Sequence, residues 1–416
     1  MRIARSRTSS LIAALAIMAT ACSGAGTAPD LGAADSLAAL PRALTATERQ
    51  AITAGNDFAL RLLQRTSARS AGNVLLSPLS VSLALGMTMN GAADETRSEM
   101  QRVLGWGAAN RADINVAYRD LMTMLPALDG RVTVRIANGI WMLQPKVPDA
   151  TFVGEARQFF NAPVTSEVTP RAMFDAVNAW GDRETRGMIP KVLQQDPPRD
   201  LAMLLANAVY FAGTWRDRFD PAKTSPGPFQ LEGSTTATVP MMAREGGFRS
   251  WRDDRLVAVE MPYGNAAFSM LVLMPTRDAV GPFVATLDTV RLTQVVQGLR
   301  EARADERLRF PKFTLESALE LSPDLRALGM TRAFSDAAQF PRLVTNESTK
   351  LSFVQHNVKV EVDEKGTRAA AVTVVGVVVT SVPLGVDIDR PFVFLIRERL
   401  SGTLLFAGVV RNPLAR

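Results

Sequence analysis

Hydrophobic residues recur along this chain with two different spacings, and the helical spacing comes first. Thr45 and Glu48 have the spacing of a capping box, and apolar residues behind them fall on one helical face. Ser77 and Pro78 form a helix start, since serine caps free amides and proline suits the first helical turn. Residues 79–89 are almost wholly apolar, which predicts a helix buried on most of its sides.

Strand patterns dominate the second half of the chain. Between Val358 and Val362 apolar residues alternate with Lys359 and Glu361, as in a strand with one buried and one wet face. Short apolar runs bounded by Gly, Pro or Asn predict further strands at residues 204–211, 257–262 and 268–275. Because helical segments lead and strands follow, the pattern predicts the α+β class.

The N-terminal residues read as an export signal followed by a tether. Residues 1–21 have a basic start, a short apolar centre and a small-residue exit, which is typical of a signal peptide. Ala19-Thr20-Ala21-Cys22 resembles a bacterial lipobox, so we expect Cys22 to be lipidated; plain cleavage is the alternative. We interpret residues 22–48 as a lipid-anchored flexible linker and residues 49–416 as one domain.

Composition excludes several kinds of chemistry. The 416 residues include one histidine and one cysteine, whereas a structural zinc site takes about four such ligands and a disulfide takes two cysteines. We therefore expect no metal and no cofactor. The net charge of +6 is spread along the chain, which is a poor argument for nucleic acid. There is no G-x-S-x-G elbow and no G-x-x-x-x-G-K loop, so we expect no catalytic residues and no enzyme.

One segment near the C-terminus has an unusual composition. Gly366 and three alanines precede a run of valines, and the stretch from Ala369 to Val386 carries no charge. Thr, Ser, Gly and Pro383 interrupt it, which disfavours a membrane span. A fixed core strand would favour larger side chains throughout, so the small residues need another explanation.

This segment resembles the hinge and reactive loop of the serpins, the serine protease inhibitor superfamily. Further stretches resemble the family in the same order along the chain: residues 73–80, 91–96, 207–215, 239–242, 261–263 and 389–394. The chain is thus identified as a serpin of a bacterial lipoprotein type. The resemblance implies the serpin fold, with about three β-sheets, eight or nine helices and an exposed reactive-centre loop.

The resemblance also assigns site residues. It implies a hinge made of Glu364, Gly366, Thr367, Ala369, Ala370 and Ala371. It implies a polar cluster beneath the main sheet, called the shutter, made of Ser77, Ser80, Asn207 and His356. Trp215 matches the tryptophan at the top of the sheet. The family's usual spacing from Gly366 places the reactive bond between Thr380 and Ser381, after Val379.

The period of a strand supports this register. Thr367, Ala369 and every second residue up to Val379 are small or medium and uncharged, whereas Arg368 lies on the other face. The hinge is therefore compatible with insertion into a closed sheet, which has little room for large side chains.

The resemblance implies an inhibitor that traps a serine protease covalently, the protease being its partner. The loop has no Lys or Arg between Arg368 and Arg390, which favours elastase-like or subtilisin-like targets over trypsin-like ones. A non-inhibitory serpin that binds or carries a ligand is the alternative. We expect an exported monomer, either secreted or anchored through Cys22 and facing the periplasm or cell exterior, with no other membrane contact and no nucleic-acid partner.

Overall fold

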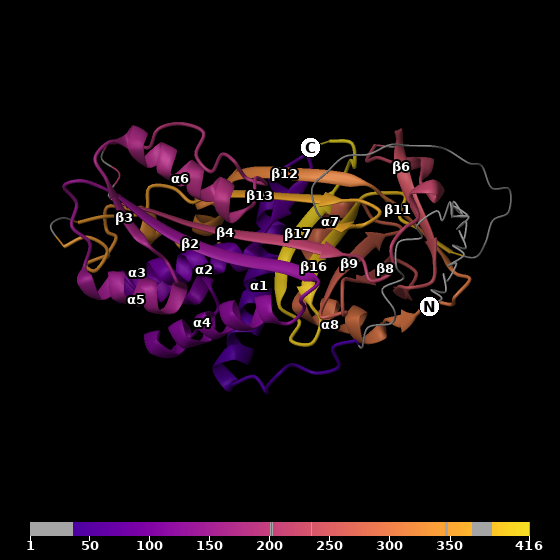
Figure 1. Cartoon of the computed structure of the whole chain (residues 1–416), viewed down its shortest axis with the longest axis horizontal. Helices are drawn as coiled ribbons and strands as arrows, with labels where there is room; N and C mark the ends of the chain where they lie inside the picture. The colour runs from indigo at the N-terminus through magenta and orange to yellow at the C-terminus, as the bar shows by residue number, and fades with distance from the viewer. Residues whose placement is uncertain are drawn as a thin grey trace, which may run out of the picture. The chain divides into compact units, whose positions relative to one another are not determined.

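The computed structural model describes residues 36–199, 201, 203–233, 235–345, 348–367 and 385–415. Its first two helices fall where the helical spacing predicts them, four more follow in the N-terminal half, and three lie between the later strands (Figure 1). The described helices are α1 (Ala46–Ala68), α2 (Pro78–Met89), α3 (Asp94–Val103), α4 (Arg111–Ala127), α5 (Ala150–Phe160), α6 (Pro170–Glu184), α7 (Val280–Thr286), α8 (Thr289–Gly298) and α9 (Ser322–Ala327), with 3₁₀ turns at Pro221–Lys223 and Arg332–Phe334.

The packed structure begins before residue 49, where we expected the domain to start. The capping box is formed, since the Thr45 hydroxyl accepts from the Glu48 amide at 3.1 Å and the Glu48 carboxylate accepts from the Thr45 amide at 2.7 Å. Upstream of it, Leu37, Leu40 and Leu44 pack against the hydrophobic core. These leucines bury apolar area, so residues 36–48 are more closely tied to the domain than a flexible linker would be.

The strands form three sheets. The six-stranded sheet has the order β12 (Phe313–Glu320), β13 (Gln355–Val362), β14 (Gly366–Thr367), β4 (Met203–Thr214), β2 (Val132–Leu143) and β3 (Val164–Glu167). The seven-stranded sheet has the order β1 (Val74–Leu76), β17 (Leu404–Val410), β16 (Phe392–Glu398), β9 (Phe268–Pro275), β8 (Leu256–Pro262), β7 (Arg249–Arg252) and β10 (Arg300–Glu301). The four-stranded sheet has the order β15 (Gly385–Asp387), β11 (Arg307–Pro311), β6 (Thr236–Glu245) and β5 (Ser225–Gln230).

These elements confirm the expected α+β class with three sheets, and nine α-helices lie within the described residues. The predicted alternation in β13 is also confirmed, because every second residue from His356 to Val362 is buried. Helix α2 is buried along nearly its whole length, as its apolar sequence predicts.

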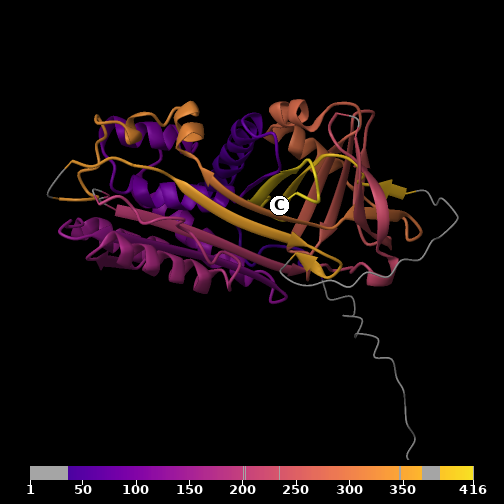
Figure 2. The ribbon, with the colours of Figure 1, turned by 90° about the horizontal axis from the view of Figure 1, so that it is seen from above.

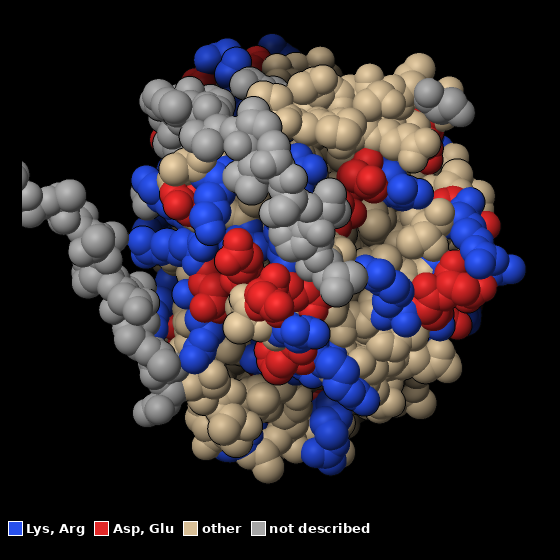
Figure 3. All heavy atoms as spheres, turned by 90° about the vertical axis from the view of Figure 1, so that its right-hand side faces the viewer, with Lys and Arg blue, Asp and Glu red and all other residues tan. Residues whose placement is uncertain are grey.

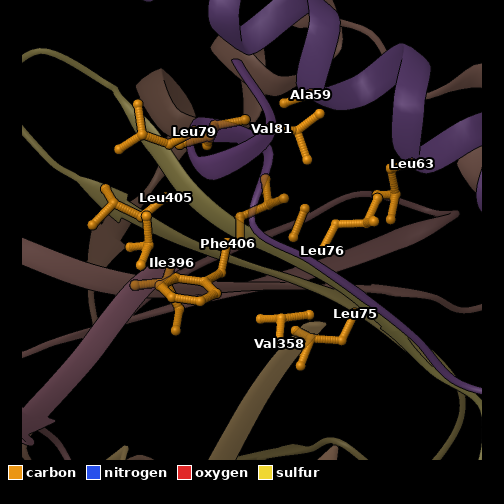
Figure 4. Packing of buried hydrophobic residues seen from close by; sticks show 14 of the residues in the cluster. Ala59, Leu63, Leu75, Leu76, Leu79, Val81, Val358, Ile396, Leu405 and Phe406 are labelled. Carbon is orange, nitrogen blue, oxygen red and sulfur yellow. The ribbon is translucent and has the colours of Figure 1, made fainter. Parts of the chain in front are cut away.

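The largest core lies between helices α1 and α2 and the strands beneath them (Figure 4). Ala59 and Leu63 of α1 and Val81 of α2 face Leu76 of β1 and Phe406 of β17. Each of these side chains is at most 3% exposed. The packing fixes α2 against the β1–β17 edge, and this position brings the start of α2 close to strand β13.

The β4 region of the six-stranded sheet is covered on both faces. Leu204, Ala206 and Ala208 of β4 belong to a second apolar cluster that includes Val177 and Trp180 of α6. The neighbouring positions in β4, Val209 and Phe211, belong to the main core on the opposite face. Figure 2 shows α6 on one side of β2 and β4 and the N-terminal helices on the other. Strand β4 is therefore buried on both faces in the middle of the molecule.

Candidate functional site: the hinge and the polar cluster beneath the sheet

The segment between β13 and β14 is a tight turn. The Asp363 carboxylate accepts hydrogen bonds from the amides of Lys365, at 2.8 Å, and Gly366, at 3.1 Å. The Asp363 amide donates to the Gly366 carbonyl oxygen at 2.9 Å. An aspartate that binds backbone amides in this way is a usual turn former, and here it reverses the chain so that β14 runs back beside β13.

Strand β14 lies between β13 and β4 at one end of the six-stranded sheet. Thr367 is paired with Val362 of β13, and the β14 residues Gly366 and Thr367 are paired with Thr214 and Gly213 of β4. A Cβ atom at Gly366 would overlap the carbonyl oxygen of Gly213 and lie 2.8 Å from Thr214 Cα. Only glycine therefore fits at this approach of β14 to β4.

An aromatic cluster lies directly beneath this end of the sheet. The indole ring of Trp215 stacks on the ring of Tyr263, with centroids 4.4 Å apart and planes 11° apart. The indole nitrogen of Trp215 donates to the Asp363 carbonyl oxygen at 2.9 Å, and its backbone amide donates to the Lys365 carbonyl oxygen at 2.9 Å. Both rings are at most 1% exposed. Trp215 thus holds the turn that leads into β14.

Glu364 anchors the same turn through its side chain. Its carboxylate accepts from the Lys312 ammonium group at 2.8 Å and from the Thr224 hydroxyl at 2.8 Å. Burial alone would raise the pKa of Glu364, but the hydrogen bonds from Lys312 and Thr224 outweigh it and lower the pKa. Glu364 is therefore ionised at neutral pH and ties the turn to β11–β12 and to the loop before β5.

The four residues assigned to the shutter lie together where the start of α2 meets β4, which carries Asn207, and β13, which carries His356. The backbone amide of Ser77, not its hydroxyl, donates to His356 Nε2 at 3.0 Å. The Ser77 hydroxyl donates to the Leu405 carbonyl oxygen at 2.9 Å, and the Ser80 hydroxyl donates to the Asn207 carbonyl oxygen at 3.4 Å. Backbone groups therefore provide most of the hydrogen-bond partners of these side chains.

The side chain of Asn207 finds its partner in strand β2. Asn207 Nδ2 donates to Asn138 Oδ1 at 2.6 Å, and Asn138 Nδ2 donates to the Phe160 carbonyl oxygen at 2.6 Å. Next to these groups, a cavity of about 70 Å³ is lined by β4, β13 and α2, with Ser80, Asn207 and His356 among its walls. The polar cluster is thus connected to β2 and α5 as well as to α2.

His356 is neutral in this cluster. It is buried, and burial lowers its pKa from 6.5 to about 4. The hydrogen bond from the Ser77 amide requires an unprotonated Nε2. His356 therefore connects β13 to the start of α2 as a hydrogen-bond acceptor rather than as a cation.

We expect His356 to make the stability of the domain depend on pH. The unfolded chain takes up the His356 proton near pH 6.5 and the folded chain only near pH 4, so stability falls as the pH is lowered through this window. Between pH 7 and pH 5 the loss should be about 2 kcal/mol. Urea midpoints of the wild type and His356→Gln at both pH values measure this, and the variant should lose less stability. An equal loss in both proteins would contradict the prediction.

Several predicted site residues lie outside the described residues. These are Ala369, Ala370 and Ala371 of the hinge, Val379, Thr380 and Ser381 at the reactive bond, and Cys22. Their assigned roles stay predictions. Of the predicted site, the structure brings Glu364, Gly366, Thr367 and Trp215 together at one end of the sheet. It brings the four shutter residues together where the start of α2 meets β4 and β13.

Sequence reasoning missed four residues of this site. Lys312, Thr224 and Asn138 bind the predicted residues directly, and Tyr263 shares a hydrogen bond with Thr367. Lys312 carries a detectable signal, since it is the one charge in the apolar run Phe310-Pro311-Lys312-Phe313. A lone charge amid core residues requires a buried partner of opposite sign.

Metal-binding clusters and membrane spans are absent from the part of the chain that the structure describes. It contains no group of three or more His, Cys, Asp or Glu residues placed to hold a metal ion. None of its helices combines the length and the apolar character that crossing a bilayer requires.

Three features define the class of protein: a sheet with a short strand between two long ones, a buried tryptophan at that end, and a polar cluster near the middle of the sheet. Comparison with known proteins identifies the family. The model of the family described as "Serpin (serine protease inhibitor)" matches residues 53–413. The chain therefore belongs to the serpin family. The family's description names inhibitors of serine proteases and not enzymes, which agrees with the prediction that the chain is not an enzyme.

Individual relatives match over most of their length. Iripin-1 of Ixodes ricinus is 33% identical over 371 residues, which cover 86% of this chain and 94% of that protein. The structure of mouse protein-Z dependent protease inhibitor has 26% identity and a TM-score of 0.79, covering 88% of this chain and 98% of that one. The structure of thyroxine-binding globulin in complex with thyroxine has 27% identity and a TM-score of 0.80, covering 87% of this chain and 99% of that one.

Proposed function

We propose that this serpin is a suicide-substrate inhibitor of serine endopeptidases. A target protease attacks the reactive bond, predicted between Thr380 and Ser381, and forms an acyl-enzyme. The freed N-terminal part of the loop then extends β14 along β13 and β4. A strand of about fourteen residues at about 3.3 Å per residue carries the tethered protease about 46 Å, and the adduct is trapped before hydrolysis completes.

The position of β14 carries this proposal. Gly366 and Thr367 already stand between β13 and β4, and both residues are buried. Among the described residues, β13 and β4 are joined in the sheet only through this short strand. The next residues of a cut loop would therefore continue an existing strand rather than start a new one.

The sequence of the loop, and not the charge of the protein surface, is the basis for the proposed target protease. The end of the molecule that carries β5, β6 and β11 has acidic and basic side chains intermixed (Figure 3). Ion pairs between these elements and their neighbours include Lys223–Glu245, Arg307–Asp387 and Arg309–Asp387. A surface of mixed sign does not steer a partner of one charge. The small residues Val379, Thr380 and Ser381 support an elastase-like or subtilisin-like protease.

One comparison favours a second candidate function. Thyroxine-binding globulin binds a small molecule, as its name says, and its fold is as similar to this chain as that of the protease inhibitor above. A carrier does not need its loop to enter the sheet. The small residues of this hinge, with no charge on the inward side, support inhibition over transport.

Export and lipidation belong to the proposal as well. The basic start of residues 1–21 and the string Ala19-Thr20-Ala21-Cys22 support a signal peptide followed by a lipidated cysteine. The inhibitor would then act outside the cytoplasm, on proteases in the periplasm or at the cell exterior.

We expect incubation with pancreatic elastase or subtilisin to give an adduct that survives SDS. Trypsin is the matched control, because its acidic pocket requires Lys or Arg and the loop offers none between Arg368 and Arg390. The peptide released from the loop should begin at Ser381 by mass spectrometry. Complete cleavage of the loop by elastase and subtilisin without any adduct would reject inhibition and favour a carrier.

A further inference from the structure

Two hydroxyl groups meet beneath the end of strand β14. The phenol oxygen of Tyr263 and Oγ1 of Thr367 lie 2.5 Å apart and share a hydrogen bond. Tyr263 has no exposed surface and Thr367 is 1% exposed. Neither hydroxyl can turn to solvent, so each depends on the other for its hydrogen bond.

Tyr263 is held rigidly in place from its backbone and from its ring. It follows β8, forms an isolated bridge with Trp215, and donates its amide to the Phe268 carbonyl oxygen at 2.8 Å. Its ring is stacked on Trp215 and lies edge-on to Phe211 of β4, with ring centroids 5.0 Å apart. The position of the phenol hydroxyl is therefore fixed, and Thr367 binds to it when the hinge enters the sheet.

We propose that Tyr263 is a positioning residue for loop insertion, because its hydroxyl seats Thr367 in the sheet before the reactive bond is cut. The inference rests on the proposed inhibitory function. Burial raises the pKa of Tyr263, so the phenol keeps its proton throughout the working pH range and the hydroxyl pair persists. Trp215 holds the preceding turn, and Tyr263 holds the first residue beyond it.

Seating has a consequence for the order of events. When Thr367 is seated, cleavage of the loop is followed directly by extension of β14, because the first two residues of the new strand are in register with β13 and β4. When Thr367 is released from the Tyr263 hydroxyl, the hinge must first return to its place between β13 and β4. During that time the protease hydrolyses its acyl-enzyme. Seating therefore raises the fraction of encounters that end in a trapped complex.

Tyr263→Phe and Thr367→Val each remove one hydroxyl while keeping the side chain's shape. Each leaves the other hydroxyl buried without a partner, which should release the hinge about tenfold more often. We expect faster hydrogen–deuterium exchange in residues 363–367 of the uncut full-length protein. The number of inhibitor molecules consumed per trapped elastase should rise several-fold. For Tyr263→Phe the rate of the first encounter with elastase should not fall, since residue 263 is buried and far from the predicted reactive bond in sequence.

The double variant Tyr263→Phe with Thr367→Val distinguishes positioning from mere packing. Two apolar groups of matching shape replace the hydroxyl pair, and this double replacement is nearly neutral for stability. The hydrogen–deuterium exchange of residues 363–367 and the number of inhibitor molecules consumed per trapped elastase should therefore return towards wild-type values. Thr367→Ser, which keeps the hydroxyl, is the conservative control and should behave like the wild type. A packing role of Tyr263 would give additive effects with no coupling to residue 367. Additive effects, or single variants that exchange like the wild type, would overturn the inference.

The two readouts separate this inference from the proposed function. Exchange in residues 363–367 is measured without any protease, so it decides whether the hydroxyl pair seats the hinge even in a protein that traps nothing. If wild-type protein forms no adduct while the exchange data show coupling, seating stands and inhibition fails. If adducts form but the effects of the two single substitutions simply add in the double variant, inhibition stands and the role of Tyr263 fails.

Discussion

Thr367→Arg should convert the inhibitor into a substrate that elastase cleaves and leaves. Thr367 is 1% exposed, and its side chain points at Tyr263. An unpaired guanidinium in this place costs several kcal/mol, and every 1.4 kcal/mol in the competition between insertion and hydrolysis is a factor of about ten. We therefore expect the number of inhibitor molecules consumed per trapped protease to rise at least tenfold.

The measurement is a titration of elastase with each variant, followed by SDS gels of the products. Lys365→Arg is the matched control, because it places an arginine two residues earlier at an exposed position of the same turn. The control should titrate like the wild type. Unchanged trapping by Thr367→Arg would mean that residue 367 does not face into the sheet during insertion, and the proposed register would be wrong.

Cleavage of the reactive loop should raise the melting temperature by roughly 20 °C. Insertion adds about ten ladder hydrogen bonds of about 1 kcal/mol each and buries valines worth about 1.5 kcal/mol or more each. A gain of roughly 15 kcal/mol corresponds to about 20 °C for a domain of this size, which loses about 0.8 kcal/mol of stability per degree near its midpoint. The uncut protein is then the less stable of two folded states.

Differential scanning fluorimetry of the cut and the uncut protein tests this directly. Cut Thr367→Arg is the control, since its loop is severed but its hinge cannot enter the sheet, and it should melt where the uncut variant melts. A wild-type protein that melts no higher after cleavage would remove the energy source of the proposed mechanism, whatever its behaviour with proteases.

Sequence reasoning succeeded where the information is local. The two-residue period predicted β13, and the unbroken apolar run predicted that α2 is buried. Both patterns reflect burial of one element against the rest of the chain, which each element's own residues encode. The short strand β14 is a boundary case, because the small residues around Gly366 suggested a tight approach but not which backbone atoms cause it.

The partners of the site could not be predicted because they come from distant parts of the chain. Tyr263 lies 104 residues before Thr367, and Asn138 lies 69 residues before Asn207. No periodicity links such positions; only the folded arrangement of the strands and the packing of the sheets bring them together. The hydrogen bonds of Ser77 and Asn207 illustrate a second limit, since backbone amides and carbonyls have no signature in the residue types.

Gly213 of β4 and Gly366 of β14 restrict how this protein can be engineered for higher stability. Replacing glycine by alanine often stabilises a protein by limiting the freedom of its unfolded chain. At Gly154, within α5, an added methyl group meets no atom within 4 Å, whereas at Gly213 it would lie 2.9 Å from the Tyr263 ring. More stable variants are therefore better sought in the helices than at the end of the six-stranded sheet where the proposed insertion begins.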